Sequence, residues 1–127
     1  MIRVLVVEDD ADVRHLVRDQ MIGLGYAVVA VASAEAALDV LKSDTGFDVL
    51  FTDIRMPGGK NGRELADKIA TIIPGLPVLY TSGYSAAVSI ENGHLAPGML
   101  MLQKPYRRQE LARMLTVALD SKRSDPA

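Results

Sequence analysis

Four short stretches of polar residues each directly follow a run of strand-forming residues. Carboxylates, hydroxyls and an ammonium that meet at one place have the chemistry to bind a hard cation and to receive a phosphoryl group. In a parallel sheet the carboxyl ends of the strands lie along one edge, which is where ligands bind in open α/β folds. The groups are Glu8, Asp9 and Asp10; Asp53; Thr81, Ser82 and Gly83; and Gln103, Lys104 and Pro105.

Carboxylates brought together repel one another and raise each other's pKa. A divalent cation removes that conflict, and Mg²⁺ prefers oxygen ligands while keeping water or phosphate oxygens in its remaining positions. An aspartate beside such an ion can act as a nucleophile that forms an acyl phosphate. The metal and Lys104 would neutralise charge on the transferred group, while the Ser82 hydroxyl and a backbone N–H would hold its oxygens.

Each of these residues also has an ordinary structural explanation. Acidic residues after the first strand could cap a helix, a role that we expect of Asp10. Asp53 and Ser82 could be turn residues, and Lys104 could be a solvated surface lysine. All of these explanations would have to hold together, each at the carboxyl end of a strand, so the combination favours a functional site.

Alternation of strand-like and helix-like segments predicts how these residues are positioned. A parallel sheet with helices on both faces follows from this alternation. In the first helix the residues Val13, Leu16, Val17, Met21 and Leu24 recur at helical spacing and predict the buried face. We expect strands at 4–7, 27–32, 47–52, 76–81 and 99–102, and helices at 10–24, after Ser33, at 62–73 and at 107–119, with a weak helix at 86–91.

Composition limits the class of protein. The chain has 127 residues, 49% hydrophobic and 24% charged, with a net charge of −2 and no cysteine. These values predict one domain, with neither the basic surface of a direct nucleic-acid binder nor a disulfide framework. No apolar run reaches the ~20 residues of a membrane helix, and the N-terminus is unlike a signal peptide. We therefore expect a cytoplasmic domain over residues 1–120, with no membrane partner, followed by a disordered polar tail at 121–127.

The polar groups and their surroundings resemble a family. The segments "VLVVEDDADVR", "LFTDIRMPGGKNG", "PVLYTSGY" and "LQKPY", in this order, are similar to those of response-regulator receiver domains of two-component phosphorelay signalling. The resemblance extends from Arg3 to about Leu119. It implies a flavodoxin-like (βα)5 fold, a doubly wound five-stranded parallel sheet in the order 2-1-3-4-5.

The resemblance also implies roles for individual residues. Asp53 becomes the phosphoacceptor, and Asp9 the main acidic ligand of Mg²⁺ (or Mn²⁺), with Glu8 beside it. The backbone carbonyl of Arg55 would complete the protein ligands. The remaining implied roles are the switch hydroxyl for Ser82, a backbone N–H donor for Gly83, phosphoryl binding for Lys104, and a cis peptide bond between Lys104 and Pro105.

Three positions depart from the usual receiver pattern. Gly62 lies nine residues after Asp53, one more than in many receivers, as in receivers attached to hybrid histidine kinases. The usual aromatic switch position, three residues before the lysine, is Met101. Tyr84, just after the Ser82 loop begins, is a candidate replacement for that aromatic.

The family implies a histidine kinase or a histidine phosphotransfer protein as donor and a downstream protein as target. It implies a monomer or a phosphorylation-dependent homodimer. The domain is then not an enzyme in the usual sense, although it assists its own phosphorylation and dephosphorylation. Two other hypotheses are an aspartyl-nucleophile phosphatase and a degenerate receiver that only docks. Such phosphatases need a second acid two residues after the nucleophile, where this chain has Arg55.

Overall fold

The computed structural model describes residues 1–55, 61–82 and 100–123 of the chain, with side chains described as far as residue 120. Strands and helices alternate through most of this length, as the sequence predicts. None of the helices in the described part is long and apolar enough to cross a membrane. The elements are β1 (Arg3–Val7), α1 (Ala11–Gly23), β2 (Ala27–Val31), α2 (Ala34–Leu41), β3 (Val49–Asp53), α3 (Gly62–Ile72), β4 (Val78–Ser82), β5 (Leu100–Gln103) and α5 (Arg108–Arg123).

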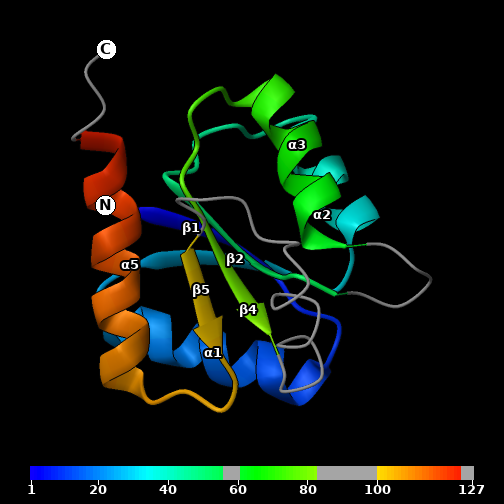
Figure 1. The fold of residues 1–127 in the computed structure, drawn as a ribbon. Coiled ribbons are helices and arrows are strands. Elements are labelled where there is room, and N and C mark those ends of the chain that lie inside the picture. Colours follow the sequence, from blue (N-terminus) through cyan, green and yellow to red (C-terminus); the bar gives the residue numbers. More distant parts are fainter. Residues whose placement is uncertain (56–60, 83–99, 124–127) are drawn as a thin grey trace, which may run out of the picture.

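The five strands form one sheet in the order β2-β1-β3-β4-β5, and every pair of neighbours is parallel. This confirms the predicted fold class and strand order. Helices α1 and α5 cover one face of the sheet, and α2 and α3 cover the other (Figure 1). The central strand β3 is buried along its whole length, which explains why its sequence is a continuous apolar run rather than an alternating one.

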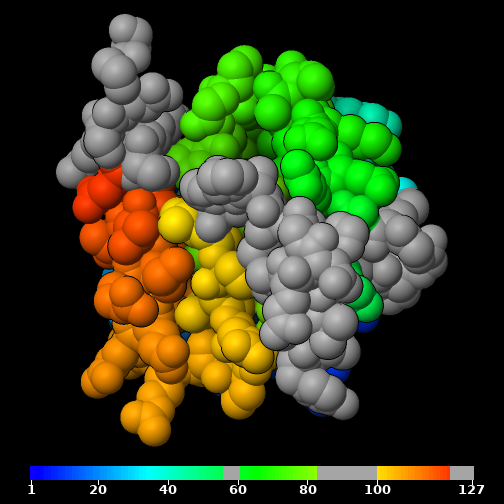
Figure 2. Space-filling model, viewed as in Figure 1, coloured from blue at the N-terminus to red at the C-terminus, as the bar shows by residue number. Residues whose placement is uncertain are grey.

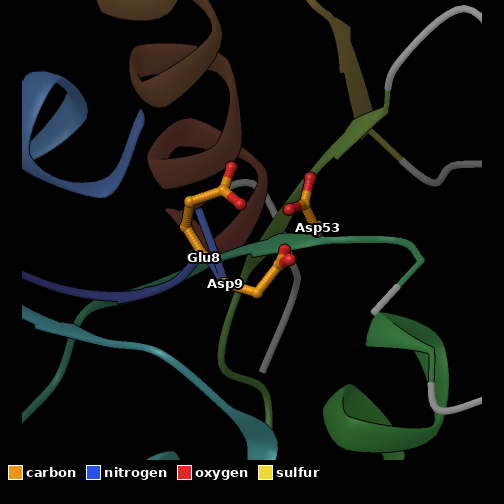
Figure 3. Close-up of side chains that lie close together, drawn as sticks. All are labelled: Glu8, Asp9 and Asp53. Atoms are coloured by element: carbon orange, nitrogen blue, oxygen red, sulfur yellow. The ribbon is translucent and has the colours of Figure 1, made fainter. Parts of the chain in front are cut away.

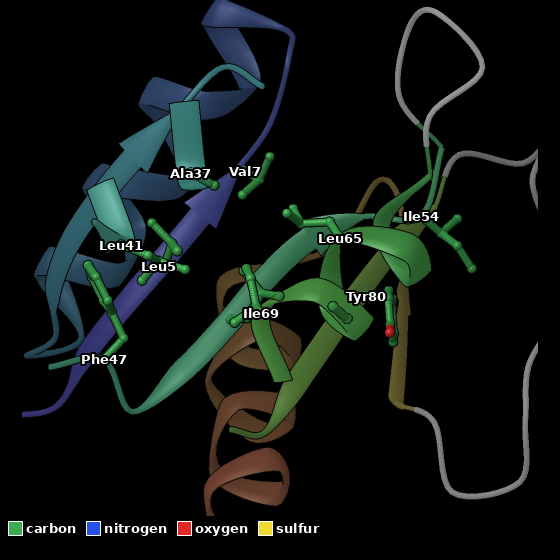
Figure 4. Packing of buried hydrophobic residues seen from close by; sticks show 11 residues of the cluster. Leu5, Val7, Ala37, Leu41, Phe47, Ile54, Leu65, Ile69 and Tyr80 are labelled. Carbon is green, nitrogen blue, oxygen red and sulfur yellow. The ribbon is translucent and has the colours of Figure 1, made fainter. Parts of the chain in front are cut away.

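Alternate residues of each strand divide between two hydrophobic cores. Leu5, Leu50 and Tyr80 belong to the core beneath α2 and α3 (Figure 4). Phe51 and Leu79 belong to the other core, beneath α1 and α5. Because side chains alternate between faces along a strand, the same pattern decides on which face each polar strand end presents its side chain.

The edge strand β5 is less enclosed than the central strands. Its residues Leu100 and Met101 are half-buried, whereas Leu102 is buried beneath α5. In the space-filling view this segment (yellow) forms a strip at the surface beside α5 (orange) (Figure 2). The outermost position of β5 in the strand order accounts for this exposure.

Helices α1, α2 and α3 begin at side-chain caps. Asp10 caps α1 as predicted, since its carboxylate accepts a hydrogen bond from the Val13 N–H at 3.1 Å. Ser33 caps α2 in the same way, through the Ala36 N–H. Helix α1 closes at Gly25, whose φ of 98° is a left-handed conformation that glycine adopts without steric cost.

One predicted core residue was wrong. Leu16 is 58% exposed, although its spacing in α1 suggested an inward position. Val17 and Met21, four residues apart, are the fully buried residues of this helix. Leu16 lies about 100° around the helix from Val17, so its side chain faces solvent rather than the sheet.

The C-terminal helix is longer than predicted. Helix α5 continues to Arg123, beyond the expected end at residue 119 and into the segment expected to be a tail. The weak helix expected at 86–91 lies outside the described residues.

Candidate functional site

The polar strand ends meet at the carboxyl edge of the sheet. Asp53 ends β3 and pairs in register with Thr81 of β4, while Ser82 pairs with Gln103 of β5. Glu8 follows β1 directly, and Lys104 follows β5. The parallel register therefore brings the segments that the sequence identified to the same level of the sheet.

Three carboxylates form the acidic part of this edge. Oxygens of Glu8, Asp9 and Asp53 all lie within 4.8 Å of one another (Figure 3). Glu8 is 3% exposed and Asp53 is 6% exposed, whereas Asp9 is open to solvent. In the close-up the Glu8 and Asp53 side chains extend toward each other, Glu8 from just after β1 and Asp53 from the end of β3.

Lys104 pairs with two of these carboxylates. Its Nζ lies 2.6 Å from Glu8 Oε1 and 2.8 Å from Asp53 Oδ1. Burial alone would lower the pKa of Lys104, but the hydrogen bonds and charges of Asp53 and Glu8 outweigh it and raise that pKa. Lys104 therefore stays cationic and holds the two buried acids together.

One ammonium does not neutralise three carboxylates. Burial and the hydrogen bond and charge of Asp53 raise the pKa of Glu8 to about 7, even though Lys104 opposes the shift. Burial is the largest cause of this shift, and the neighbouring Asp53 carboxylate adds an excess of negative charge. The all-oxygen donor set and this excess fit Mg²⁺, which favours carboxylate ligands and partial hydration.

A hydroxyl contacts Asp53 from the neighbouring strand, but it belongs to Thr81. Its Oγ1 donates a hydrogen bond to Asp53 Oδ1 at 2.8 Å. The hydroxyl of Ser82, the predicted one, is buried and has no hydrogen-bond partner within the part of the chain that the structure describes. Sequence reasoning named Thr81 among the polar strand ends but assigned it no role, because the register that pairs it with Asp53 is decided by packing between distant segments.

Two further residues shape the site from behind. The Arg14 guanidinium on α1 donates to the backbone carbonyl of Glu8 at 2.9 Å and to that of Asp9 at 3.4 Å. Gly62, at the start of α3, donates its N–H to the Ile54 carbonyl at 2.8 Å. A Cβ on Gly62 would overlap the backbone carbonyl of Asp53, so only glycine allows α3 to begin so close to the strand end.

The other predicted residues have mixed outcomes. Arg55 is exposed and forms an antiparallel bridge with Asn61. Met101 is half-buried and packs against the core beneath α2 and α3. The peptide bond between Lys104 and Pro105 is cis, as the resemblance implied. Gly83 and Tyr84 lie outside the described residues.

Together these features define a doubly wound α/β domain with an acidic, lysine-containing cluster at the carboxyl edge of its sheet. A family model of the response regulator receiver domain matches residues 4–116. The chain therefore belongs to the response regulator receiver family of two-component signalling.

Individual relatives agree with this assignment. The chain is 43% identical over 109 residues to the response regulator protein FleR of Pseudomonas aeruginosa. The match covers 86% of this chain and 23% of FleR. It is 30% identical to the response regulator receiver protein CpdR of Brucella abortus, with coverage of 87% of this chain and 91% of CpdR. Thus it spans less than a quarter of FleR and nearly all of CpdR.

Solved structures match over almost the whole chain. A response regulator receiver protein from Sinorhizobium medicae superposes with a TM-score of 0.81 at 28% identity, covering 95% of this chain and 96% of that one. The receiver domain of the hybrid histidine kinase CckA superposes with a TM-score of 0.75 at 27% identity, covering 92% and 98%. These similarities agree with the observed strand order.

Proposed function

We propose that this domain accepts a phosphoryl group on Asp53 from a phosphohistidine donor, and that the aspartyl phosphate acts as a signalling switch or a relay intermediate. The observation that carries the proposal is Asp53 held at 2.8 Å by Lys104 within a cluster of three carboxylates. A histidine kinase or a histidine phosphotransfer protein is the donor, and a downstream protein reads the result.

Glu8, Asp9, Asp53 and the backbone carbonyl of Arg55 would hold Mg²⁺ or Mn²⁺. When bound, the ion supplies charge neutralisation for the transferred phosphoryl oxygens. Lys104 moves part of its hydrogen bonding from the carboxylates to those oxygens, and it remains charged while it does so. The Ser82 hydroxyl is buried and has no hydrogen-bond partner among the described residues, so it is a candidate donor to a phosphoryl oxygen, and the Gly83 N–H is a second donor.

Phosphorylation shifts a conformational population rather than creating a new fold. The modification adds about −1.5 to −2 charge beside residues already rich in negative charge. A bias of a few kcal/mol exchanges major and minor states. We propose that the Ser82 loop and β5, which carries Met101, respond to it, with Tyr84 as a second candidate. Amide NMR shifts with and without beryllofluoride test this, and changes confined to the pocket would contradict it.

The decisive test of phosphorylation uses a small phosphoryl donor. Wild-type protein incubated with acetyl phosphate and Mg²⁺ should gain one phosphoryl group in intact-mass measurements. Asp53→Asn should gain none, while Asp39→Asn, an exposed change on α2, should label normally. Equal labelling of Asp53→Asn, or no labelling of the wild type by either acetyl phosphate or a cognate kinase, would refute the proposal.

Two competing functions give different outcomes in the same assays. A phosphatase would turn over p-nitrophenyl phosphate, but Arg55 occupies the position where such enzymes need an acid. A degenerate docking module would fail to bind Mg²⁺ in a titration. The complete set of Asp9, Asp53, Ser82 and Lys104 supports the phosphorylatable receiver over both. We further propose a cytoplasmic domain over residues 1–120 that is monomeric or dimerises on phosphorylation.

A further inference from the structure

Thr81 contacts the proposed phosphoacceptor, although the sequence identified it only as one of the hydroxyls that end the fourth strand and assigned it no role of its own. Its Oγ1 lies 2.8 Å from Asp53 Oδ1, and both residues are almost fully buried, at 1% and 6% exposure. This contact joins two neighbouring strands at the level where Asp53 and Thr81 are register partners.

The sheet geometry makes this contact a built feature rather than a chance approach. Leu79 and Phe51 both point into the core beneath α1 and α5. Thr81 and Asp53 follow them by two residues each, so strand alternation places both side chains on the same face. Thr81 is also β-branched, which restricts its χ1 rotation and keeps the hydroxyl directed at Asp53.

Two donors converge on the same carboxylate oxygen. Asp53 Oδ1 accepts from Thr81 Oγ1 and from Lys104 Nζ, each at 2.8 Å. Thr81 lies on β4 and Lys104 follows β5, so Oδ1 is held from two elements at once. Rotation of the carboxylate about its Cβ–Cγ bond would break both interactions.

We infer that Thr81 is a positioning residue for phosphoryl transfer, holding Oδ1 so that Oδ2 of Asp53 faces the phosphoryl donor. This inference rests on the proposed function. An Oδ2 lone pair forms the new O–P bond while the P–N bond of a phosphohistidine breaks, and the electron pair of that bond stays on the imidazole nitrogen. With acetyl phosphate the P–O bond breaks instead and acetate leaves with the electron pair.

Thr81 differs from Lys104 in what it contributes. A neutral hydroxyl orients the carboxylate without neutralising it, so the nucleophile keeps its charge. Lys104 supplies charge as well and has a second partner in Glu8 at 2.6 Å. Orientation of a nucleophile lowers the barrier without strengthening metal binding, so removal of the Thr81 hydroxyl should affect transfer rate more than Mg²⁺ affinity.

The experiment compares Thr81→Val, which keeps the shape and removes the hydroxyl, with Thr81→Ser, which keeps the hydroxyl. Thr52→Val is the matched control, because Thr52 is equally buried but its hydroxyl donates to the Asp53 backbone carbonyl at 3.1 Å. The phosphorylation rate with acetyl phosphate at saturating Mg²⁺, the Mg²⁺ dissociation constant and the thermal midpoint are measured for each variant.

Thr81→Val should slow phosphorylation by roughly tenfold, as expected for loss of a hydrogen bond to a charged group, and should leave Mg²⁺ affinity nearly unchanged. Thr81→Ser and Thr52→Val should retain most of the wild-type rate. Wild-type speed in Thr81→Val, or equal slowing in Thr81→Ser, would overturn the inference while leaving the proposed function intact. Absence of labelling in the wild type would overturn both.

Discussion

Lys104, which follows β5, pairs with Glu8, which follows β1, and its Nζ lies 2.6 Å from Glu8 Oε1 at the carboxyl edge of the sheet. The residue proposed to bind phosphoryl oxygens therefore occupies a proposed metal ligand. An ammonium and a metal ion would compete for the same buried carboxylates. Several consequences of this competition can be measured without a known partner kinase.

Replacement of Lys104 should separate metal binding from phosphorylation. In Lys104→Met the carboxylates of Glu8 and Asp53 lose their shared cation, so Mg²⁺ should bind more tightly than in the wild type. The metal-free variant should lose about 1–3 kcal/mol of unfolding free energy, since charged groups are left unpaired. Urea unfolding with EDTA and with Mg²⁺ measures both effects. Lys68→Met, an exposed change on α3, should alter neither, and weaker Mg²⁺ binding in Lys104→Met would contradict the competition.

The raised pKa of Glu8 makes metal binding depend on pH. Mg²⁺ binds the ionised carboxylate, so its apparent affinity should increase as the pH rises through about 7, the pKa of Glu8 in the metal-free protein. Glu8→Gln should bind Mg²⁺ more weakly and lose this component of the pH dependence. Calorimetric titrations between pH 6 and pH 8 test the prediction, with ~1 proton released per ion at the low end. Identical pH profiles in both proteins would refute it.

The same pKa sets the sign of a stability effect in EDTA. The folded-state pKa of Glu8, about 7, exceeds its ordinary value of 4.5. The contribution of Glu8 to the stability of the folded state is therefore fully present below pH 4.5 and is lost as the pH rises through about 7. The thermal midpoint of the wild type should fall relative to Glu8→Gln across this window, and Mg²⁺ should reverse the trend. A constant difference between the two midpoints would show that Glu8 does not titrate there.

A methyl group at Gly62 should damage the pocket from behind. In Gly62→Ala the Cβ would overlap the Asp53 carbonyl oxygen, so either α3 or the end of β3 must shift. Overpacking of this kind costs about 1–3 kcal/mol, and the displaced Asp53 should label more slowly with acetyl phosphate. Gly23→Ala is the control, because its Cβ would meet only the flexible end of the Arg108 side chain. Chemical unfolding and labelling rates measure the two effects, and equal results for both variants would be contrary to expectation.

Loss of the Arg14 side chain should weaken Mg²⁺ binding through Glu8 and Asp9. In Arg14→Met their backbone carbonyls lose the guanidinium donor, and the turn that carries both acids is free to move. Residues that support metal ligands typically change affinity by roughly tenfold or more. Arg18→Met, which removes only an exposed pair with Asp19, is the matched control for a Mg²⁺ titration. Equal affinities in the two variants would show that Arg14 does not support the site.

The sequence by itself determined the architecture and most of the site. Continuous apolar runs at Val4–Val7 and around Phe51, each followed by a carboxylate, are sufficient to predict a parallel sheet with an acidic edge. When helices connect parallel strands, the carboxyl ends of the strands lie along the same edge of the sheet. That rule places Glu8, Asp53 and Lys104 at the same edge of the sheet. The caps at Asp10 and Ser33 are equally local and were predictable for the same reason.

Only the tertiary structure decided which side chains touch. Leu16 and Val17 are both apolar residues of α1, and the angle at which the helix lies on the sheet exposes one and buries the other. Thr81 and Ser82 are adjacent hydroxyls, and the register between β3 and β4 selects Thr81 as the partner of Asp53. Register and helix orientation arise from packing between segments distant in sequence, so they carry no local signal that the residues alone could reveal.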